Sequence, residues 1–396
     1  MSDFPVYIHA CGSHSALGKE TSDIHQSLSG NKAPSMRAEG GWLNDGKSTV
    51  VGKAEGELPE VPSSLSGFNT RNNQLVLSAL QQIEPQIQEA KAKYGADRIA
   101  VVVGTSTSGI SDGEIALSEK LQLGAFSAGY HCRKQELGNP AEFVARYLDL
   151  SGPTYAISTA CSSSGRVFLS AKRLLKSGFV DAVIVGGTDT LCKLTLNGFN
   201  SLEALSNTPC LPFSPNRKGI NIGEASAYML LSAEQKDSDD PIALLGAGDS
   251  SDAHHISAPH PEGKGAIEAM EKALKDAGLH ATDIGYINAH GTATPLNDAM
   301  ESKAANAVFG SQTPISSTKP LTGHTLGAAG IIEASICWHI LKFNLALPVQ
   351  INDGKIDPEL AEINLVQSQS LEKKAIISNS FAFGGNNISL IFGYHS

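Results

Sequence analysis

The sequence predicts an α/β fold built from two similar halves, and three observations support this prediction. Short apolar runs typical of strands alternate with stretches of helical periodicity. Glycine is abundant, at 39 of 396 residues, which suits a fold with many tight turns between strands and helices. Motifs of the first half return in the same order in the second half, which indicates an internal duplication. The length exceeds one small domain of about 150 residues, so we expect two core-sized lobes.

The clearest elements are short strands and three longer helices. The expected strands are Val6–Ala10, Ile99–Val103, Ala182–Val185, Ile242–Leu245, Tyr286–Asn288, Ala375–Ser378 and a final strand at Ile388–Phe392. The expected helices are Ser162–Lys176, Lys264–Ala277 and Gly327–Phe343. The polar, acidic segment Ser232–Asp240, followed by Pro241, has the composition of a linker. We therefore expect an N-terminal half over residues 1–236 and a C-terminal half over residues 237–396.

The duplication rests on three pairs of matching segments. Each pair combines a strand-like run with a turn of similar composition. The pairs are Val6–Gly12 with Ile242–Gly248, Ile99–Ser106 with Ile284–Thr292, and Tyr155–Gly165 with Ala375–Gly385. The offset between the halves differs from pair to pair, so the N-terminal half must carry extra residues between its first and second motifs.

Composition excludes several function classes. Thirty Lys and Arg against 40 Asp and Glu give a net charge of −10, which argues against nucleic-acid binding driven by the overall charge of the protein. The sequence lacks an unbroken run of 18 apolar residues and begins without the pattern of a signal peptide, so we expect no membrane span and a cytoplasmic protein. The six cysteines include no C-x-x-C pair, which argues against zinc ribbons and thioredoxin-type sites and favours reduced thiols.

One cysteine lies where chemistry is expected. Cys161 follows the strand-like Tyr155–Ser158 and precedes a well-patterned helix, within the small-residue run Ser158–Gly165. The free N–H groups and positive dipole at a helix N-terminus favour thiolate over thiol. Small neighbours leave room for a large substrate. The alternative is a packed structural cysteine in a serine-rich helix start.

Two histidines and a lysine occupy similar element boundaries in the second half. His290 follows the strand Tyr286–Asn288, and small residues after it predict that its ring faces an open space. Lys319 and His324 are separated by proline and glycine, which predicts a loop, and Glu333 follows on the next helix. A lone histidine is more often structural than catalytic. Four such groups in glycine-, threonine- and serine-rich turns indicate an active site.

The last turn, Ser378–Asn387, precedes the final strand. Its glycines after Phe383 expose backbone N–H groups that could bind an oxyanion. It lacks the lysine and the spacing of a P-loop. The alternative is a simple tight turn.

With these motifs, essentially the whole chain resembles the β-ketoacyl-acyl carrier protein synthases, decarboxylating condensing enzymes with a thiolase-type fold. The resemblance implies duplicated αβαβα layered halves. It rests on Thr159–Ser163, His290–Pro295, Lys319–His324 with Gly327–Gly330, and Asn379–Gly385. Weaker matches are Pro212-Phe213 with Arg217 and Gly219, Gly223-Glu224, and Asp252–His255 with Pro259.

The resemblance implies a role for each catalytic candidate. Cys161 would be the acylated nucleophile. His290 and His324 would bind the malonyl thioester carbonyl and promote decarboxylation. Lys319 would be the essential lysine near His324, and Glu333 the carboxylate of the same network. This Cys-His-His pattern is that of the elongating class, whereas initiating synthases use Cys-His-Asn.

It also implies the surroundings of the reaction. The backbone N–H groups of Cys161 and Phe383 would form the oxyanion hole, with the Phe383 side chain as a gate. Thr292, Thr294 and Ser257 would line the malonyl end. The chemistry has no redox step, so no cofactor is expected.

Some positions depart from the usual family pattern. Ser214 replaces a common Asp, Ala225 and Ala382 replace Gly, and Asn386 replaces Thr. These departures suggest a specialised branch that builds a polyketide or aryl-polyene-like chain. Thr105–Ser108 would give the acyl pocket a polar lining, which makes a long saturated substrate less expected.

The partner implied by the resemblance is an acyl carrier protein loaded with acyl and malonyl groups. Arg71, Arg133 and Lys264 are candidates for the basic patch that would receive this acidic protein. Pairing through a sheet edge is expected, either in a homodimer or with a homologous, catalytically silent chain length factor.

Two other readings stay open at this stage. A scaffold or chain-length partner would need no nucleophile, yet Cys161 is present. A cysteine hydrolase using Cys161 and His290 would leave Lys319 and the Phe383 turn without a purpose.

Overall fold

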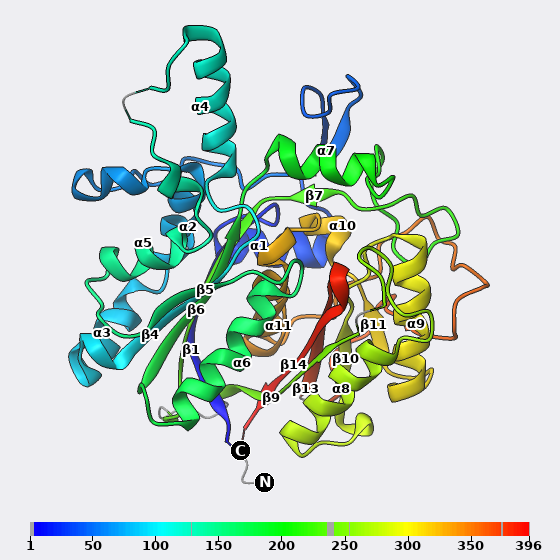
Figure 1. Cartoon of the computed structure of the whole chain (residues 1–396). Coiled ribbons are helices and arrows are strands. Elements are labelled where there is room, and N and C mark those ends of the chain that lie inside the picture. The colour runs from blue at the N-terminus through cyan, green and yellow to red at the C-terminus, as the bar shows by residue number, and fades with distance from the viewer. Residues whose placement is uncertain (1–3, 128, 236–240, 253, 374, 396) are drawn as a thin grey trace.

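The computed structural model describes residues 4–127, 129–235, 241–252, 254–373 and 375–395. Within these residues, a mixed sheet of 11 strands forms the centre of the protein (Figure 1). The strands from the first half are, in spatial order, β1 (Val6–His14), β8 (Ala225–Ser232), β6 (Ala182–Asp189), β4 (Ile99–Gly104) and β5 (Thr154–Ile157). Those from the second half are β9 (Ile242–Ser251), β14 (Asn386–Tyr394), β13 (Ala375–Phe381), β10 (Tyr286–Asn288), β11 (Pro314–Ser316) and β12 (Asn364–Leu365).

The two sets of strands meet where β1 pairs with β9, through Val6 with Leu244 and Tyr7 with Ala243. Moving outward from this junction, each half repeats the same sequence of antiparallel and then parallel pairs. All of the predicted strands form, and several extend further than predicted. The duplication is therefore visible in the order of the strands.

The third predicted repeat, however, pairs the wrong segments. In the sheet, β5 lies outside β4, and the strand that lies outside β10 in the other half is β11, not β13. The counterpart of the Cys161 turn is thus the turn that carries Lys319 and His324. The similar composition of Tyr155–Gly165 and Ala375–Gly385 does not reflect equivalent positions.

Helices cover the sheet on its outer faces and fill the space between its two halves, which gives the predicted five-layered αβαβα arrangement (Figure 1). The first outer layer contains α2 (Arg71–Leu80), α3 (Glu84–Tyr94) and α5 (Asn139–Tyr147). The second contains α8 (Lys264–Ala277) and α9 (Pro295–Phe309). Between the two halves lie α6 (Ser163–Lys176) and α11 (Ala329–Phe343), which contact each other and strands of both halves. The largest apolar core surrounds this central pair.

The two central helices cross at their N-terminal ends, where glycine is required. A Cβ atom added to Gly330 would lie 2.5 Å from the backbone nitrogen of Gly165, closer than folded proteins allow. Nearby, the Ile331 N–H donates to the Ser164 hydroxyl at 3.0 Å. These contacts bring the turns before α6 and α11 together, although they come from different halves.

The remaining elements lie above this core. They are α1 (Thr21–Gly30), α4 (Ile110–Leu123), α7 (Lys193–Ser201), the short α10 (Lys319–Thr322) and a small sheet of β2 (Met36–Glu39), β3 (Thr49–Gly52) and β7 (Ile222–Gly223). Helix α4 projects from the body of the protein (Figure 1). The prediction of a loop from Lys319 to His324 was wrong in part, because Lys319–Thr322 form one helical turn with Pro320 in second place.

One segment, Leu326–Phe343, is long and apolar enough to cross a membrane by length and composition, but 83% of it is buried inside the protein. It contains α11, so its apolar character is that of a core helix. Residues 236–240 of the predicted linker and Ala253 lie outside the described residues. The boundary between residues 236 and 237 therefore stays a prediction.

Candidate active site

The Cys161 turn is built to hold the sulfur at the start of α6. Ala160 adopts a left-handed backbone conformation with φ of 53°, which is unusual for a residue with a side chain. The Ser163 hydroxyl stabilises the turn by donating to the Ala160 carbonyl and accepting the Thr159 N–H at 2.9 Å. The Cys161 side chain is buried, at 6% exposure.

Burial dominates the protonation of this cysteine. It raises the pKa of the Cys161 thiol to about 11, although the charge of Lys319 and the backbone N–H groups of Phe383 and Cys161 act in the opposite direction. The prediction that the helix terminus favours the thiolate in the resting protein was therefore wrong, because desolvation outweighs the dipole. Both N–H groups lower the pKa of the thiol, so each acts on the sulfur, and their role as an oxyanion hole stays a prediction.

His324 contacts the nucleophile directly. Its Nε2 atom lies 3.0 Å from the Cys161 sulfur, and its Nδ1 atom accepts the Leu326 N–H at 3.2 Å. Because Nδ1 is an acceptor, the proton of the neutral ring belongs on Nε2 and points at the sulfur. The backbone of His324 is held from the other half, since its N–H donates to the Asn221 carbonyl at 2.6 Å.

His290 completes a buried group with Lys319 and Glu333. Its ring is perpendicular to that of His324, at 89°, with the centroids 5.3 Å apart. The Lys319 Nζ atom lies 3.3 Å from His290 Nδ1 and 2.5 Å from Glu333 Oε1. Lys319 donates to Nδ1, so the His290 proton also belongs on Nε2. The expectation that this ring faces an open space was wrong, since His290 is 1% exposed.

Both imidazoles are held neutral. Burial, reinforced by the charge of Lys319, holds the pKa of His290 and of His324 well below the usual value of 6.5. Burial also raises the pKa of Glu333, against the influence of Lys319. The site therefore presents two neutral N–H donors beside a thiol, with one buried cation behind them.

Two acids that the sequence analysis gave no role support the His290 turn from α9. Glu301 accepts the N–H groups of His290 and Gly291, at 2.7 and 2.6 Å. Asp298 accepts those of Phe213 and Ala293, at 2.9 and 3.1 Å. Their spacing of three residues on a helix was the available signal, since it places both on one face.

The predicted gate lies on a glycine-rich turn after β13. The Phe383 ring is half-buried and packs against Phe199 of α7, with centroids 5.9 Å apart. Gly384 has a φ of 80° and donates its N–H to the Ile256 carbonyl at 3.0 Å. Phe199 had not been singled out from the sequence, because no local pattern connects it to the final turn.

The residues predicted at the malonyl end are only partly brought together. The Thr292 and Thr294 hydroxyls lie 2.8 Å apart, next to His290 in the chain. Ser257 instead contacts the exposed His255 ring, with its N–H at 3.2 Å from Nδ1. Among the described residues, no hydrogen bond joins Ser257 to either threonine.

Thr105, Thr107 and Arg71 have different roles from those expected. The Thr105 and Thr107 hydroxyls donate to the buried carboxylate of Asp189, both with fully buried side chains, so they do not give a pocket a polar lining. Arg71 forms an ion pair with the buried Glu224, which leaves it poorly suited to dock a partner. Ser214 donates to Asp353 at 2.8 Å, and an aspartate there would face a like charge.

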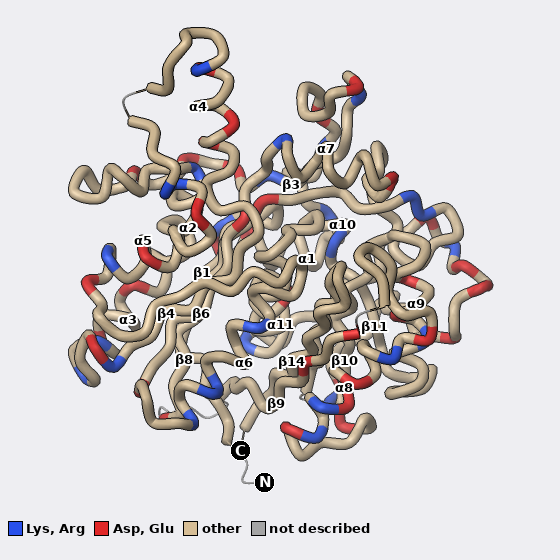
Figure 2. Tube along the Cα trace, viewed as in Figure 1, with Lys and Arg blue, Asp and Glu red and all other residues tan. Residues whose placement is uncertain are grey.

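Positively charged residues do not gather in a single patch on the face shown in Figure 2. Lys and Arg alternate with Asp and Glu over this side (Figure 2). Arg133 and Lys264 are exposed. Nothing in their contacts separates them from other surface cations.

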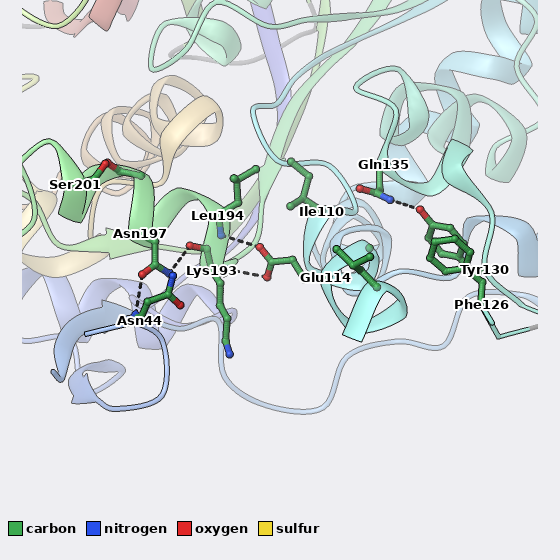
Figure 3. A pocket seen from close by; sticks show the side chains of 13 residues that line it. Asn44, Ile110, Glu114, Phe126, Tyr130, Gln135, Lys193, Leu194, Asn197 and Ser201 are labelled. Atoms are coloured by element: carbon green, nitrogen blue, oxygen red, sulfur yellow. Dashed lines mark hydrogen bonds between the residues drawn. The ribbon is translucent and has the colours of Figure 1, made fainter. Parts of the chain in front are cut away.

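A cavity of about 630 Å³ lies between α4 and α7, away from Cys161 (Figure 3). Its apolar wall includes Phe126 and Tyr130, whose rings stack 4.5 Å apart. Glu114 of α4 accepts the backbone N–H groups of Lys193 and Leu194, which ties α7 to α4 (Figure 3). Cys161 is not among the residues that line this cavity.

The donor atoms of Cys161, His290 and His324 lie within 4.8 Å of one another, so the trio could hold a metal ion by distance alone. The Lys319 ammonium lies 3.3 Å from His290. A positive charge at that distance opposes binding of a cation.

The sequence matches the N-terminal domain of the β-ketoacyl synthases over residues 4–237 and their C-terminal domain over residues 243–352. Among curated proteins, 3-oxoacyl-[acyl-carrier-protein] synthase 2 of Staphylococcus aureus (strain COL) is 34% identical over 313 residues, which cover 75% of each chain. The Synechocystis protein of the same name is 36% identical over 317 residues, or 76% of each chain.

Solved structures agree with this assignment. A structure described as the ketosynthase ApeO in complex with its chain length factor ApeC, from Xenorhabdus doucetiae, superposes with a TM-score of 0.95 at 53% identity. The match covers 99% of this chain and 98% of that chain. A β-ketoacyl synthase from Burkholderia phymatum gives a TM-score of 0.86 at 27% identity, over 99% and 100% of the chains.

The fold and site are those of a thiolase-like condensing enzyme, a class that transfers acyl groups and joins them through a carbon–carbon bond. More particularly, the chain belongs to the β-ketoacyl synthase family.

Proposed function

We propose that this chain performs decarboxylative Claisen condensation between an acyl group on Cys161 and a malonyl group, both delivered by an acyl carrier protein. One observation carries the assignment of residues: the Cys161 sulfur, the Nε2 atom of His324 and a ring nitrogen of His290 meet in one buried site. The curated relatives act, by name, on acyl carrier protein thioesters.

In the first half-reaction, the Cys161 sulfur forms a bond to the acyl carbonyl carbon, and the carrier thiol leaves with the proton lost by Cys161. One thioester replaces another, so the step is nearly balanced in energy. The N–H groups of Cys161 and Phe383, which lower the pKa of the thiol, would stabilise the oxyanion of the tetrahedral intermediate. Phe383 would also gate access with its side chain.

In the second half-reaction, the bond between the malonyl α-carbon and its carboxylate breaks, and CO₂ leaves. The electron pair stays as an enolate, whose oxygen accepts the Nε2–H groups of His290 and His324. The carbanion then attacks the acyl carbonyl carbon, and Cys161 leaves as thiolate. Lys319 and Glu333 would keep His290 in the required tautomer, with Thr292, Thr294 and Ser257 at the malonyl end. The electron balance calls for no redox cofactor.

We further propose that the chain pairs with a homologous chain length factor across the end of the sheet formed by β5. This strand pairs only with β4 among the described residues, so one edge is open. Helix α4 projects from the body of the protein and exposes four large apolar side chains, each at least half exposed: Ile115, Leu117, Leu121 and Leu123. The relative at 53% identity was solved with its chain length factor.

The product class proposed is a specialised polyketide or aryl-polyene-like chain. The cavity between α4 and α7 adjoins the proposed partner face, and the flat Phe126–Tyr130 stack suits a planar unsaturated chain better than a flexible saturated one. A cytoplasmic location fits six cysteines that are all free. We also propose that the chain divides into its two halves between residues 236 and 237.

The test uses the chain alone and co-purified with a homologous chain length factor. Each preparation receives acyl carrier proteins loaded with chains of varied length and unsaturation, together with malonyl carrier protein. Carbon–carbon bond formation with a preference for unsaturated chains supports the proposal, whereas a clear preference for long saturated chains contradicts the specialised branch. Free acid would indicate a hydrolase, and no product would indicate a scaffold or chain-length partner.

The partner face has its own test. The double variant Leu121→Asp with Leu123→Asp should dissociate the proposed dimer with the chain length factor, which light scattering detects as monomers. The control double variant Glu119→Gln with Lys120→Gln, on the same helix, should leave the dimer intact. If the variant with both aspartate substitutions still forms the dimer, the interface lies elsewhere.

A further inference from the structure

Asp189 lies at the end of β6, and its buried carboxylate links two separate turns. Its Oδ1 atom accepts both threonine hydroxyls of Thr105 and Thr107, at 2.7 and 2.8 Å, and the Ser106 and Thr107 N–H groups at 2.8 and 2.7 Å. Its Oδ2 atom accepts the Ala328 N–H at 3.0 Å. The side chain is fully buried.

The turn that Oδ2 holds is strained, and it contains the donor that orients His324. Leu326 has a φ of 53°, a left-handed conformation that costs energy for a leucine. Its N–H is the one that donates to His324 Nδ1. The turn packs closely against Asp189, since a Cβ atom added to Gly327 would lie 2.8 Å from the Asp189 Oδ2 atom. A strained turn persists only where surrounding contacts hold it.

A line of contacts thus runs from the end of a strand in the first half to the nucleophile. Asp189 holds Ala328, the turn of Ala328 contains Leu326, Leu326 orients His324, and His324 points its Nε2 at the sulfur of Cys161. Without the Leu326 N–H, the neutral imidazole could carry its proton on Nδ1. It would then present a lone pair, which cannot stabilise a negative oxygen.

We infer that Asp189 is a positioning residue for His324: it anchors the strained Leu326 turn and so fixes the Nε2–H tautomer that faces Cys161. This inference rests on the proposed role of His324 in decarboxylation. It assigns to Asp189 a function that is separate from binding any substrate.

The substitution Asp189→Asn tests this link selectively. The amide oxygen can take the place of Oδ1, where four donors converge, and the NH₂ group then faces the Ala328 N–H. Two donors cannot bond to each other, so the contact to the turn is lost while the shape is kept. The Ser106 N–H also reaches Oδ2, at 3.1 Å, but it keeps its shorter bond to the oxygen that replaces Oδ1. Asp181→Asn, just before the start of the same strand, is the matched control, because Asp181 pairs with Arg98 far from the turn.

Three quantities are measured in each protein: the rate of malonyl carrier protein decarboxylation, the rate of acylation of Cys161, and the imidazole ¹⁵N signals of His324, assigned with His324→Ala. For Asp189→Asn we expect decarboxylation to slow by about 10- to 100-fold, as for a displaced catalytic group. KM and acylation should change by less than about threefold, and the ¹⁵N signals should show loss of the single Nε2–H form. Asp181→Asn should match the unmodified protein.

Unchanged decarboxylation, or slower decarboxylation with unchanged His324 signals, overturns the inference. Equal losses in decarboxylation and acylation also overturn it, because they indicate a general structural role. If His324→Ala itself decarboxylates at the normal rate, the proposed role of His324 fails instead, which distinguishes the two hypotheses.

If Asp189→Asn does not fold, Ala328→Pro removes the same N–H from the other side of the contact, together with the bond of this N–H to the Thr325 carbonyl within the turn. Ala328 has a φ of −80°, which a proline ring tolerates. The same selective loss of decarboxylation is expected, and a full rate would overturn the inference.

Discussion

The Nε2 atom of His324 lies 3.0 Å from the sulfur of Cys161, although 163 positions separate the two residues in the chain. They meet because each follows an equivalent strand of its half, β5 or β11, and each lies before a central helix, α6 or α11. The crossing of these helices at Gly165 and Gly330 sets the contact. A neutral thiol beside a neutral imidazole is the resting state that burial imposes on both.

Removing the nucleophile should separate the two half-reactions. Cys161→Ala deletes the atom that carries the acyl group but leaves both imidazoles in place. Mass spectrometry should show no acyl adduct, while CO₂ release from malonyl carrier protein continues. Cys192→Ala, at another buried thiol, is the control and should acylate normally. An acyl adduct on the Cys161→Ala protein would place the nucleophile elsewhere.

Removing one imidazole should have the opposite effect. His324→Ala and His290→Ala each delete one donor to the enolate oxygen, and the loss of such a donor typically costs about 10²- to 10³-fold in rate. We expect that loss in CO₂ release, with acylation of Cys161 retained. His280→Ala, at an exposed histidine, should leave the rate unchanged. Normal condensation by His324→Ala would refute the two-histidine assignment.

The buried pair of Lys319 and Glu333 should show strong coupling. Their side chains are 2% and 3% exposed, so removing one partner leaves an uncompensated charge and should cost about 3–5 kcal/mol of unfolding free energy. The double variant Lys319→Met with Glu333→Leu should cost less than the sum of the single variants. Lys172→Met, which breaks the more exposed pair with Asp276, should cost less than Lys319→Met. Additive losses in urea unfolding would show that the pair is not coupled.

Acid should destabilise the protein through a histidine outside the active site. Burial lowers the pKa of His339 to about 4, and the nearby His25 adds to this effect. The unfolded chain takes up this proton below about pH 6.5 and the folded chain does not, so the stability that neutral His339 contributes is present above pH 6.5 and lost as the pH falls toward 4.

His339→Gln removes this titration. The unfolding free energy of the unmodified protein, measured relative to His339→Gln, should fall by up to about 1.4 kcal/mol per pH unit between pH 6.5 and 4. His280→Gln is the control. A difference that does not change with pH would show that folding does not lower the pKa of His339.

The sequence predicted much of this structure, and the failures have physical causes. Strands, the central helices and the groups around Cys161 were predictable because apolar periodicity and turn residues are local signals. The equivalence of β5 with β11 was not, because strand order depends on long-range pairing. The raised pKa of the Cys161 thiol was missed since burial is not visible in a local motif. Phe199 and Asp189 act through contacts that no spacing encodes, whereas Glu301 shares a helix face with Asp298 through a spacing that the sequence did contain.

One experiment addresses the central claim most directly. The protein is first loaded from an acyl carrier protein, the adduct on the Cys161 peptide is weighed, and malonyl carrier protein is then added. We expect the adduct to disappear with release of one CO₂ per adduct, while the carrier gains the acyl chain extended by two carbons. Release of the acyl group as free acid, or a first adduct on another residue, would contradict it.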